Sequence, residues 1–296
     1  MKKFNVGDIE ITQVVEWEGV FPSPESLLNG YHEAAFEKHL SWLSPDYYDT
    51  KSGELKLVVQ CWLLKVGDRT ILWDTGSGND KKRPNIPVFH MLNLPFLAEL
   101  EKAGAKPEDI DTVVCSHLHI DHVGWNTKLE QGQWQPTFPN AKYVFPKVDF
   151  DFWNPANAHS VGQQVGGQVN DGVFEDSVEP IAKEGLVDFV SGIEEIGDGL
   201  RLEPAPGHTP GQMRLRVESK GEKAVLTGDV IHHPIQVYEP TWNSQFCENP
   251  EVARSTRHDL LSLCADEGVL LLPAHFAGLN AVHIDRDGEG FRIFEL

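Results

Sequence analysis

Residues 110–122 decide the fold and read I-D-T-V-V-C-S-H-L-H-I-D-H. The apolar, β-branched run at their start predicts a buried strand from Ile110 to Cys115. Four polar side chains follow the strand within six residues: His117, His119, Asp121 and His122. Imidazole nitrogens and a carboxylate suit zinc, and also iron, cobalt or manganese. A histidine-rich surface loop is the alternative interpretation of this stretch taken alone.

Three further candidate ligands occupy the same kind of position, because each lies at the end of a predicted strand or in the turn just after one. His208 lies in P-G-H-T-P-G (206–211), Asp229 ends T-G-D (227–229), and His275 ends P-A-H (273–275). Glycine and proline flank all three, and these residues allow the backbone to turn tightly next to a site. The complete set has five histidines and two aspartates, which favours a metal centre over a surface loop.

Together these motifs resemble the metallo-β-lactamase superfamily over nearly the whole chain. The strand that ends in W-D-T-G (73–76) is similar to that family's early aspartate-containing turn. The resemblance implies an α/β fold, the four-layer αββα sandwich, with two divalent metal ions at one edge between its halves. Zinc is the expected metal, with manganese, iron and cobalt as alternatives.

The resemblance also implies which residues hold each metal. One metal takes His117, His119 and His208, and the other takes Asp121, His122 and His275. Asp229 bridges them together with a water or hydroxide, and Asp121 and Asp229 are the catalytic residues because they can handle the proton. Asp74 is expected to orient a ligating imidazole from behind, although a plain turn aspartate is the simpler interpretation.

The expected reaction is hydrolysis of a lactone or carboxylic ester by the metal-bridging hydroxide. From Pro206 onward the chain resembles the branch that holds bacterial lactonases and the organophosphate hydrolases related to methyl parathion hydrolase. Arylester or phosphotriester hydrolysis is therefore an alternative. A different class is a mononuclear iron oxygenase acting on persulfides, which lacks part of the second ligand set. A non-catalytic binding protein is expected to have lost ligands, and none is lost here.

Composition limits the partners. The chain has 45 acidic and 25 basic residues and a formal net charge of −20, so we expect neither nucleic acid nor membrane as a partner. A small neutral or partly apolar substrate fits this charge better. We expect no signal peptide and a cytoplasmic location, with the four cysteines as reduced core thiols.

We expect one domain over residues 1–296, built from two β-rich halves with helices. Residues 21–49 are expected to form an irregular N-terminal excursion, either a homodimer arm or a pocket cover, and residues 150–175 a lid or pocket loop. The expected pocket wall consists of six side chains, for most of which plain core packing is the simpler interpretation: Trp125, Phe150, Phe152, Trp153, His232 and Phe276.

The expected regular elements follow from hydrophobic periodicity and from the positions of glycine and proline. Helices are expected at 95–103 and 250–265, and strands at 9–17, 55–66, 70–74, 110–115, 141–145, 200–203, 213–217, 223–227, 269–272, 282–284 and 291–294.

Overall fold

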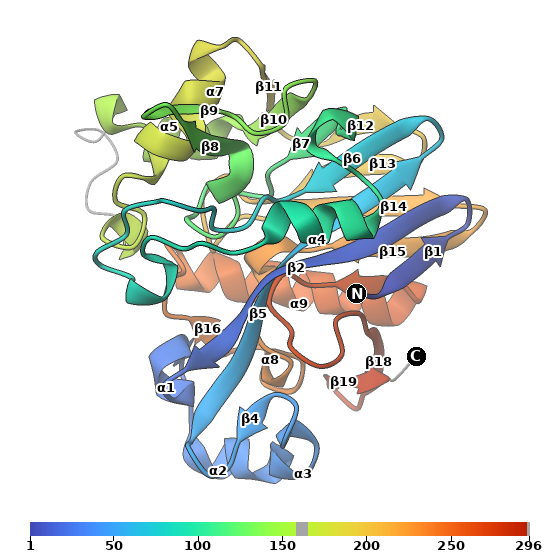
Figure 1. Ribbon diagram of the computed structural model, residues 1–296. Helices are drawn as coiled ribbons and strands as arrows, with labels where there is room; N and C mark the ends of the chain where they lie inside the picture. Colours follow the sequence, from blue (N-terminus) through green and yellow to red (C-terminus); the bar gives the residue numbers. More distant parts are fainter. Residues whose placement is uncertain (158–164, 295–296) are drawn as a thin grey trace.

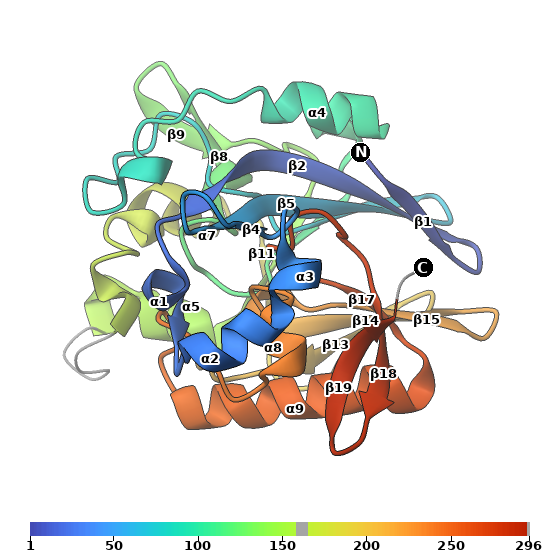
Figure 2. The ribbon, with the colours of Figure 1, turned by 90° about the horizontal axis from the view of Figure 1, so that it is seen from below.

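The computed structural model describes residues 1–157 and 165–294. Two β-sheets lie face to face, with a helix on the outer face of each (Figures 1 and 2). In Figure 2 the layers follow one another as helix α4, the first sheet, the second sheet and helix α9. This is the αββα arrangement expected from the sequence.

The first sheet has the strand order β1-β2-β5-β6-β7-β10-β11, and β4 pairs with the first two residues of β5. The strands β1, β2, β5 and β6 are antiparallel, whereas β6, β7, β10 and β11 run parallel. Their bounds are β1 Lys3–Val6, β2 Ile9–Phe21, β4 Tyr48–Asp49, β5 Glu54–Val66, β6 Arg69–Trp73, β7 Thr112–Val114, β10 Lys142–Pro146 and β11 Val187–Val190.

The second sheet has the order β12-β13-β14-β15-β17, in which only β15 and β17 pair in parallel. Its strands are β12 Glu194–Gly197, β13 Leu200–Pro204, β14 Met213–Ser219, β15 Glu222–Leu226 and β17 Leu270–Leu272. Three two-stranded sheets complete the strands: β3 Leu28–Asn29 with β16 Asn243–Ser244, β8 Thr127–Glu130 with β9 Gln133–Pro136, and β18 His283–Asp287 with β19 Gly290–Phe294.

The helices fall into two groups. The covering helices are α4 Phe96–Ala103 and α9 Pro250–Glu267, and the shorter ones are α1 Pro24–Leu27, α2 Glu33–Phe36, α3 Leu40–Leu43, α5 Lys147–Trp153, α7 Glu179–Lys183 and α8 Ile235–Tyr238. Helix α4 ends at Ala103, as predicted, whereas α9 ends at Glu267, two residues beyond its predicted end. The glycine that follows each helix, Gly104 (φ 108°) or Gly268 (φ 66°), adopts the left-handed conformation that closes a helix. Among the described residues, no helix is long and apolar enough to cross a membrane.

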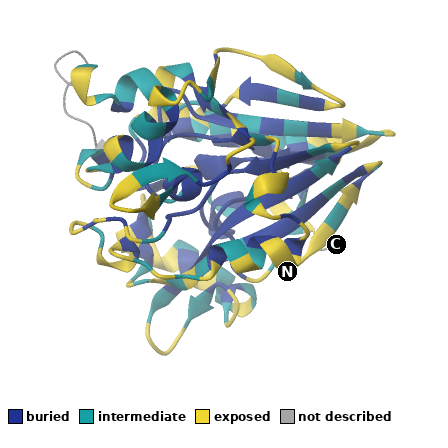
Figure 3. Cartoon of the chain, turned by 45° about the horizontal axis from the view of Figure 1, so that its top comes forward, coloured by how far each residue is buried: buried dark blue, intermediate teal, exposed yellow. Residues whose placement is uncertain are grey.

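Successive side chains of a strand point to opposite faces of its sheet, and this alternation gives each sheet two packed faces. On β5, Cys61 and Leu63 face the cluster beneath α4, whereas Trp62 and Leu64 pack between the sheets. The opposite face of the second sheet packs Leu271 against Leu260 of α9. Buried residues therefore run through the middle of every layer, as Figure 3 shows. All four cysteines lie in the described part, where they are buried and free of disulfides.

Strands β1, β8, β9, β11 and β12 and helices α7 and α8 are not among the expected elements. Two further differences lie near the ligand motifs. Strand β2 continues to Phe21, four residues beyond the predicted end, because it stays paired with β5 to Leu55. Residues 147–153 form α5, so the aromatic start of the predicted lid is helical. The rest of that lid includes 158–164, which lie outside the described residues.

Candidate metal centre

The seven predicted ligands converge at one edge of the sandwich, where strands of both sheets end. The motif 117–122 follows β7, His208 lies in the turn between β13 and β14, Asp229 follows β15, and His275 follows β17. All are buried except Asp121, which is partly exposed. Parallel pairing brings the ends of β15 and β17 together, so residues 46 positions apart meet at Asp229 and His275.

The first group of ligand atoms is a triangle of imidazoles. Nδ1 of His119 lies 3.1 Å from Nε2 of His117 and 2.8 Å from Nε2 of His208. All three side chains are buried. Three ring nitrogens aimed at one buried point suit a cation that accepts their lone pairs.

The second group combines one carboxylate with two imidazoles. The Asp121 oxygens lie 3.7 Å from Nε2 of His122 and 3.7 Å from Nε2 of His275. Together these side chains form a second set whose ligand atoms lie within 4.8 Å of one another.

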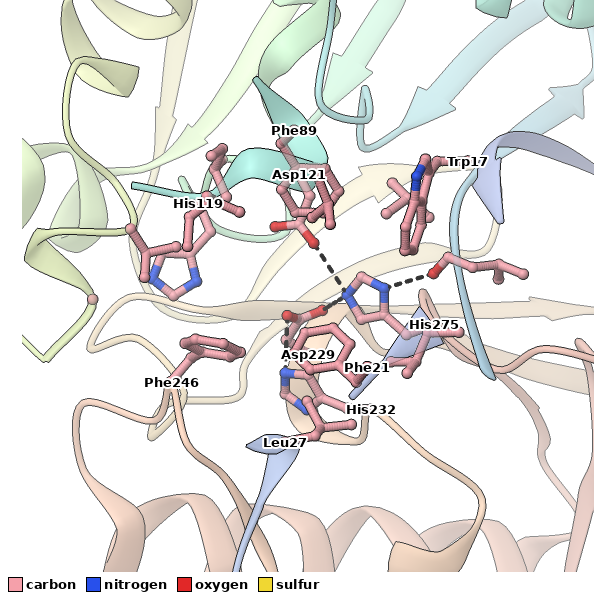
Figure 4. A pocket seen from close by; sticks show the side chains of 18 of the residues that line it. Trp17, Phe21, Leu27, Phe89, His119, Asp121, Asp229, His232, Phe246 and His275 are labelled. Carbon is pink, nitrogen blue, oxygen red and sulfur yellow. Dashed lines mark hydrogen bonds and ion pairs between the residues drawn. The ribbon is translucent and has the colours of Figure 1, made fainter. Parts of the chain in front are cut away.

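Asp229 lies between the two groups and offers one oxygen to each. Its Oδ2 is 3.2 Å from Nε2 of His208 and 3.8 Å from Nε2 of His117. Its Oδ1 is 2.9 Å from Nε2 of His275 and 3.1 Å from Nε2 of His122. A carboxylate between two ligand sets would be able to bind a cation on each side (Figure 4).

The electrostatics of the cluster also fit a cation. Burial would raise the pKa of Asp229, but the surrounding imidazoles, His122 first, hold it well below its usual range. Burial and the neighbouring imidazoles hold the pKa values of His117 and His119 well below 6.5, so these rings are neutral, as metal ligation requires. Within the described residues, Nε2 of His122 and Oδ1 of Asp229 are buried and have polar neighbours only within the cluster itself. A divalent ion would satisfy both atoms.

The outer nitrogens of three imidazoles are tied to the protein. Nδ1 of His122 lies 2.9 Å from Oδ2 of Asp74, Nδ1 of His275 donates to the carbonyl of Val58 at 2.8 Å, and Nδ1 of His117 lies 2.9 Å from Oγ of Ser116. Such contacts fix the ring and its tautomer, so that the other nitrogen faces the metal.

Asp74 has the contacts that its predicted role requires. It adopts a left-handed conformation (φ 59°) and accepts hydrogen bonds from N of Ser116 at 2.7 Å and from Oγ of Ser116 at 2.9 Å, besides its contact with His122. One buried carboxylate therefore holds both the start of the ligand motif and one of its imidazoles.

A second buried carboxylate was missed in the sequence. Asp149, on α5, accepts hydrogen bonds from Oγ1 of Thr209 at 2.8 Å, from N of Gly211 at 2.6 Å and from N of Leu118 at 3.2 Å. It thereby joins the loops that carry His119 and His208. No motif marks it, because its partners come from loops 31 and 60 or more positions away.

The cluster forms the floor of a cavity of about 190 Å³. His119, Asp121, His208, Asp229, His232 and His275 line its polar end. The walls are almost entirely apolar and come from the end of β2, the N-terminal excursion, residues 57–59 of β5, residues 86–89, and residues 120, 166, 169 and 246. The large apolar side chains in these walls include Trp17, Phe21, Leu27, Leu57, Ile86, Phe89 and Phe246.

Only part of the expected pocket wall lines this cavity. His232 does, and the ring of Trp153 packs against His119 with 5.1 Å between centroids, although Trp153 is not a lining residue. The other four expectations are corrected. Trp125 stacks on Phe96 and donates to Glu16, Phe150 packs against Phe174 and Phe189, Phe152 packs on Trp153, and Phe276 is fully buried in the core beneath α9.

The predicted N-terminal excursion and the predicted lid both reach the cavity. Phe21 and Leu27 of the N-terminal excursion line it, and so do Gly166 and Val169 of the predicted lid. N of Gly166 donates to Oε1 of Glu248 at 2.7 Å, and Nδ2 of Asn170 donates to the carbonyl of Leu118 at 2.9 Å. The described part of this segment is therefore tied to the ligand loops.

Comparison with known proteins agrees with this geometry. Residues 56–275 match the family model of the metallo-beta-lactamase superfamily. An N-acyl homoserine lactonase from Bacillus sp is 28% identical over 191 residues, which cover 59% of this chain and 64% of the relative. The lactonase AiiB from Agrobacterium fabrum is 32% identical over 94 residues, 28% of this chain and 34% of the relative. The matches thus span less than two thirds of these relatives.

Solved structures share the fold over the whole chain. AidC, described as a dizinc quorum-quenching lactonase in complex with a product, superposes with a TM-score of 0.80 at 21% identity and covers 100% of this chain and 97% of its own. The hydrolase AbOPH of the beta lactamase superfamily gives a TM-score of 0.83 at 22% identity, covering 99% and 96%. At this identity the likeness shows the fold alone.

Proposed function

Because the chain belongs to the metallo-beta-lactamase superfamily, we propose that it is a dinuclear metal-dependent hydrolase that opens lactones bearing an apolar acyl chain, with related carboxylic esters as further substrates. The observation that carries the proposal is the position of Asp229 between two complete ligand sets, at the floor of an apolar cavity. The curated relatives named above are lactonases, which supports this choice of substrate.

The two ligand sets would hold the metals, most simply zinc. His117, His119 and His208 form one site, Asp121, His122 and His275 the other, and Asp229 belongs to both. When bound, the ions would lower the pKa of a coordinated water toward 7 and polarise the substrate carbonyl. Imidazole and carboxylate ligands with no thiolate among them fit zinc as well as manganese, iron or cobalt.

The protein's own residues supply orientation and exclusion of water. Asp121 is the most exposed ligand and faces the cavity, so its carboxylate can orient the attacking water and accept its proton. Asp229 stays ionised, because the imidazoles around it hold its pKa low. Its two oxygens contact both ligand sets and so fix their relative position. The apolar walls leave little polar surface for a charged ligand, which favours a neutral lactone with a hydrocarbon chain.

A hydrolysis panel on metal-loaded protein tests the proposal. N-acyl homoserine lactones with chains of increasing length, an aryl ester, a phosphotriester, a β-lactam and a thioester are followed by proton release. We expect turnover of the lactones that a chelator abolishes. Asp229→Ala should lose it, whereas the matched control Asp188→Ala, which removes an exposed carboxylate on β11, should retain it. Turnover of the phosphotriester alone would overturn the assignment of substrate.

A further inference from the structure

Four consecutive residues of the cavity wall, 86–89, come from a loop that is closed at its base. We call this loop, residues 80–92, the wall loop. N of Asp80 donates to the carbonyl of Leu92 at 3.0 Å, which brings its two ends together. Figure 4 shows Phe89, near the tip of the loop, above the ligand cluster. The position of the wall loop therefore sets one side of the cavity.

Two buried cations near the start of the wall loop share one carboxylate. The side chains of Lys81 and Arg83 are 0% and 1% exposed. Arg83 donates from Nη1 to Oδ2 of Asp176 and from Nη2 to Oδ1, both at 2.7 Å, so this ion pair is bidentate. Nζ of Lys81 lies 3.6 Å from Oδ1 of the same carboxylate and 3.6 Å from the ring centroid of Trp134. Asp176 belongs to the π-helix Phe174–Val178, so a distant segment fastens the loop.

A buried ion pair of this kind fixes a loop more narrowly than apolar packing does. Its two parallel hydrogen bonds set an orientation as well as a distance. Burial of a charge is costly unless the charge is paired, and burial lowers the pKa of Lys81 to about 7 even though Asp176 raises it. Without the carboxylate, the two cations would regain water most simply by movement of the wall loop, because much of that loop is already exposed.

The chain between the ion pair and the cavity wall is compact. N of Ile86 donates to the carbonyl of Arg83 at 3.0 Å, and N of Phe89 donates to the carbonyl of Ile86 at 3.0 Å. N of Arg83 also donates to Nδ1 of His90 at 2.9 Å, across the loop. A displacement of Arg83 is therefore passed on to Ile86 and Phe89, which line the cavity.

We propose that Asp176 and Arg83 are positioning residues that determine which acyl-chain lengths the cavity accepts, because they fix the wall loop. This inference rests on the proposed function. Neither side chain is among the described residues that line the cavity, so both act through the loop. The metal ligands come from other segments of the chain. Loss of the ion pair should therefore raise KM for long-chain lactones and leave kcat and the metal content nearly unchanged.

The test compares two variants with a matched control. Asp176→Asn keeps the shape of the side chain and removes its charge, whereas the milder change Arg83→Lys keeps the charge and loses the bidentate geometry. Glu175→Gln is the control, because Glu175 is the neighbouring residue on the same π-helix and is exposed. On metal-loaded protein, amide hydrogen exchange of residues 80–92 and 117–122, the metal content, and kcat and KM for short-chain and long-chain lactones are measured.

We expect faster hydrogen exchange in the wall loop of Asp176→Asn, with the exchange of residues 117–122 and the metal content unchanged. For this variant kcat/KM for long chains should fall roughly 10-fold, the effect of one lost methylene contact in an apolar pocket, while the shortest chain is hardly affected. Arg83→Lys should change the same quantities in the same direction by less, and Glu175→Gln should behave like the wild type.

Two results would overturn the inference: wild-type exchange in the wall loop of Asp176→Asn, or an equal loss of kcat/KM for every chain length. If Asp176→Asn does not fold, the same comparisons on Arg83→Lys decide. If the wild-type protein opens no lactone or ester, the proposed function fails and the assignment of chain length falls with it. The exchange measurement needs no substrate, so it separates that failure from a failure of the ion pair to hold the loop.

Discussion

Replacing Asp74 by asparagine changes one charge at a position that touches no substrate. The carboxylate accepts three hydrogen bonds, from N and Oγ of Ser116 and from Nδ1 of His122, at 2.7, 2.9 and 2.9 Å. An asparagine can keep the first through its oxygen, but its NH₂ group then faces the N–H of His122. The backbone is not at issue, because asparagine tolerates the left-handed conformation that Asp74 adopts at φ 59°.

The expected loss follows from the contact with His122. A hydrogen bond to a charged group contributes about 1.5–3 kcal/mol, which corresponds to the 10- to 100-fold loss of metal affinity typical of residues that orient a ligand. Chelator competition with zinc measures it, and the loss should fall on the site that contains His122. Asp80→Asn is the control, since Asp80 has the same backbone conformation (φ 62°) but is exposed. Equal zinc affinity in Asp74→Asn and the wild type would refute the orienting role.

Three further predictions concern the framework of the site. Burial raises the pKa of the Glu16 carboxyl from 4.5 to about 6. The folded state therefore binds the carboxyl proton more tightly than the unfolded state does. The contribution of Glu16 to the free energy of unfolding then falls by about 2 kcal/mol as the pH rises from 4.5 to above 6. In metal-free protein, Glu16→Gln should therefore cost about 2 kcal/mol more at pH 4.5 than at pH 7.5, and an equal cost by urea unfolding at both would contradict the shift. Phe276→Ala should lower the free energy of unfolding by about 3–5 kcal/mol, because the side chain is fully buried in the core. A change in KM without such a loss would contradict this placement and indicate that Phe276 lines the pocket. Phe246→Ala should lower kcat/KM for long-chain lactones by roughly 10- to 100-fold, equivalent to the ~1.5–3 kcal/mol of a buried phenyl group, but hardly affect the shortest chain. An equal loss for all chain lengths would argue against an acyl-chain wall.

The metal centre could be predicted from sequence because its information is local. Each ligand lies at or just after the end of a strand, and strand ends are marked by a change from apolar residues to glycine, proline and polar residues, as at Thr227-Gly228-Asp229. The motif 117–122 alone supplies four donors. Motif matching could therefore select the candidate ligands, which the structure brings together, without knowledge of the pairing between strands. The family model confirms the family that the motifs indicate.

The cavity wall could not be predicted in this way. Trp17 and Phe21 reach the cavity because β2 pairs with β5 over its whole length, a long-range contact that no local pattern reports. Conversely, the aromatic run Phe150, Phe152 and Trp153 suggests a loop, but these residues form helix α5 and pack against protein. Aromatic side chains look alike in sequence whether they line a pocket or fill a core.

The number of metals needed for turnover tests the central claim most directly. Metal-free protein is titrated with zinc in steps, and lactone hydrolysis is measured at each step together with the bound metal. Two ligand sets that share Asp229 predict that activity rises until two equivalents are bound and then stays constant. Full activity at one equivalent would contradict a dinuclear centre, and a protein that binds one iron, consumes oxygen and hydrolyses nothing would contradict the proposed function as a whole.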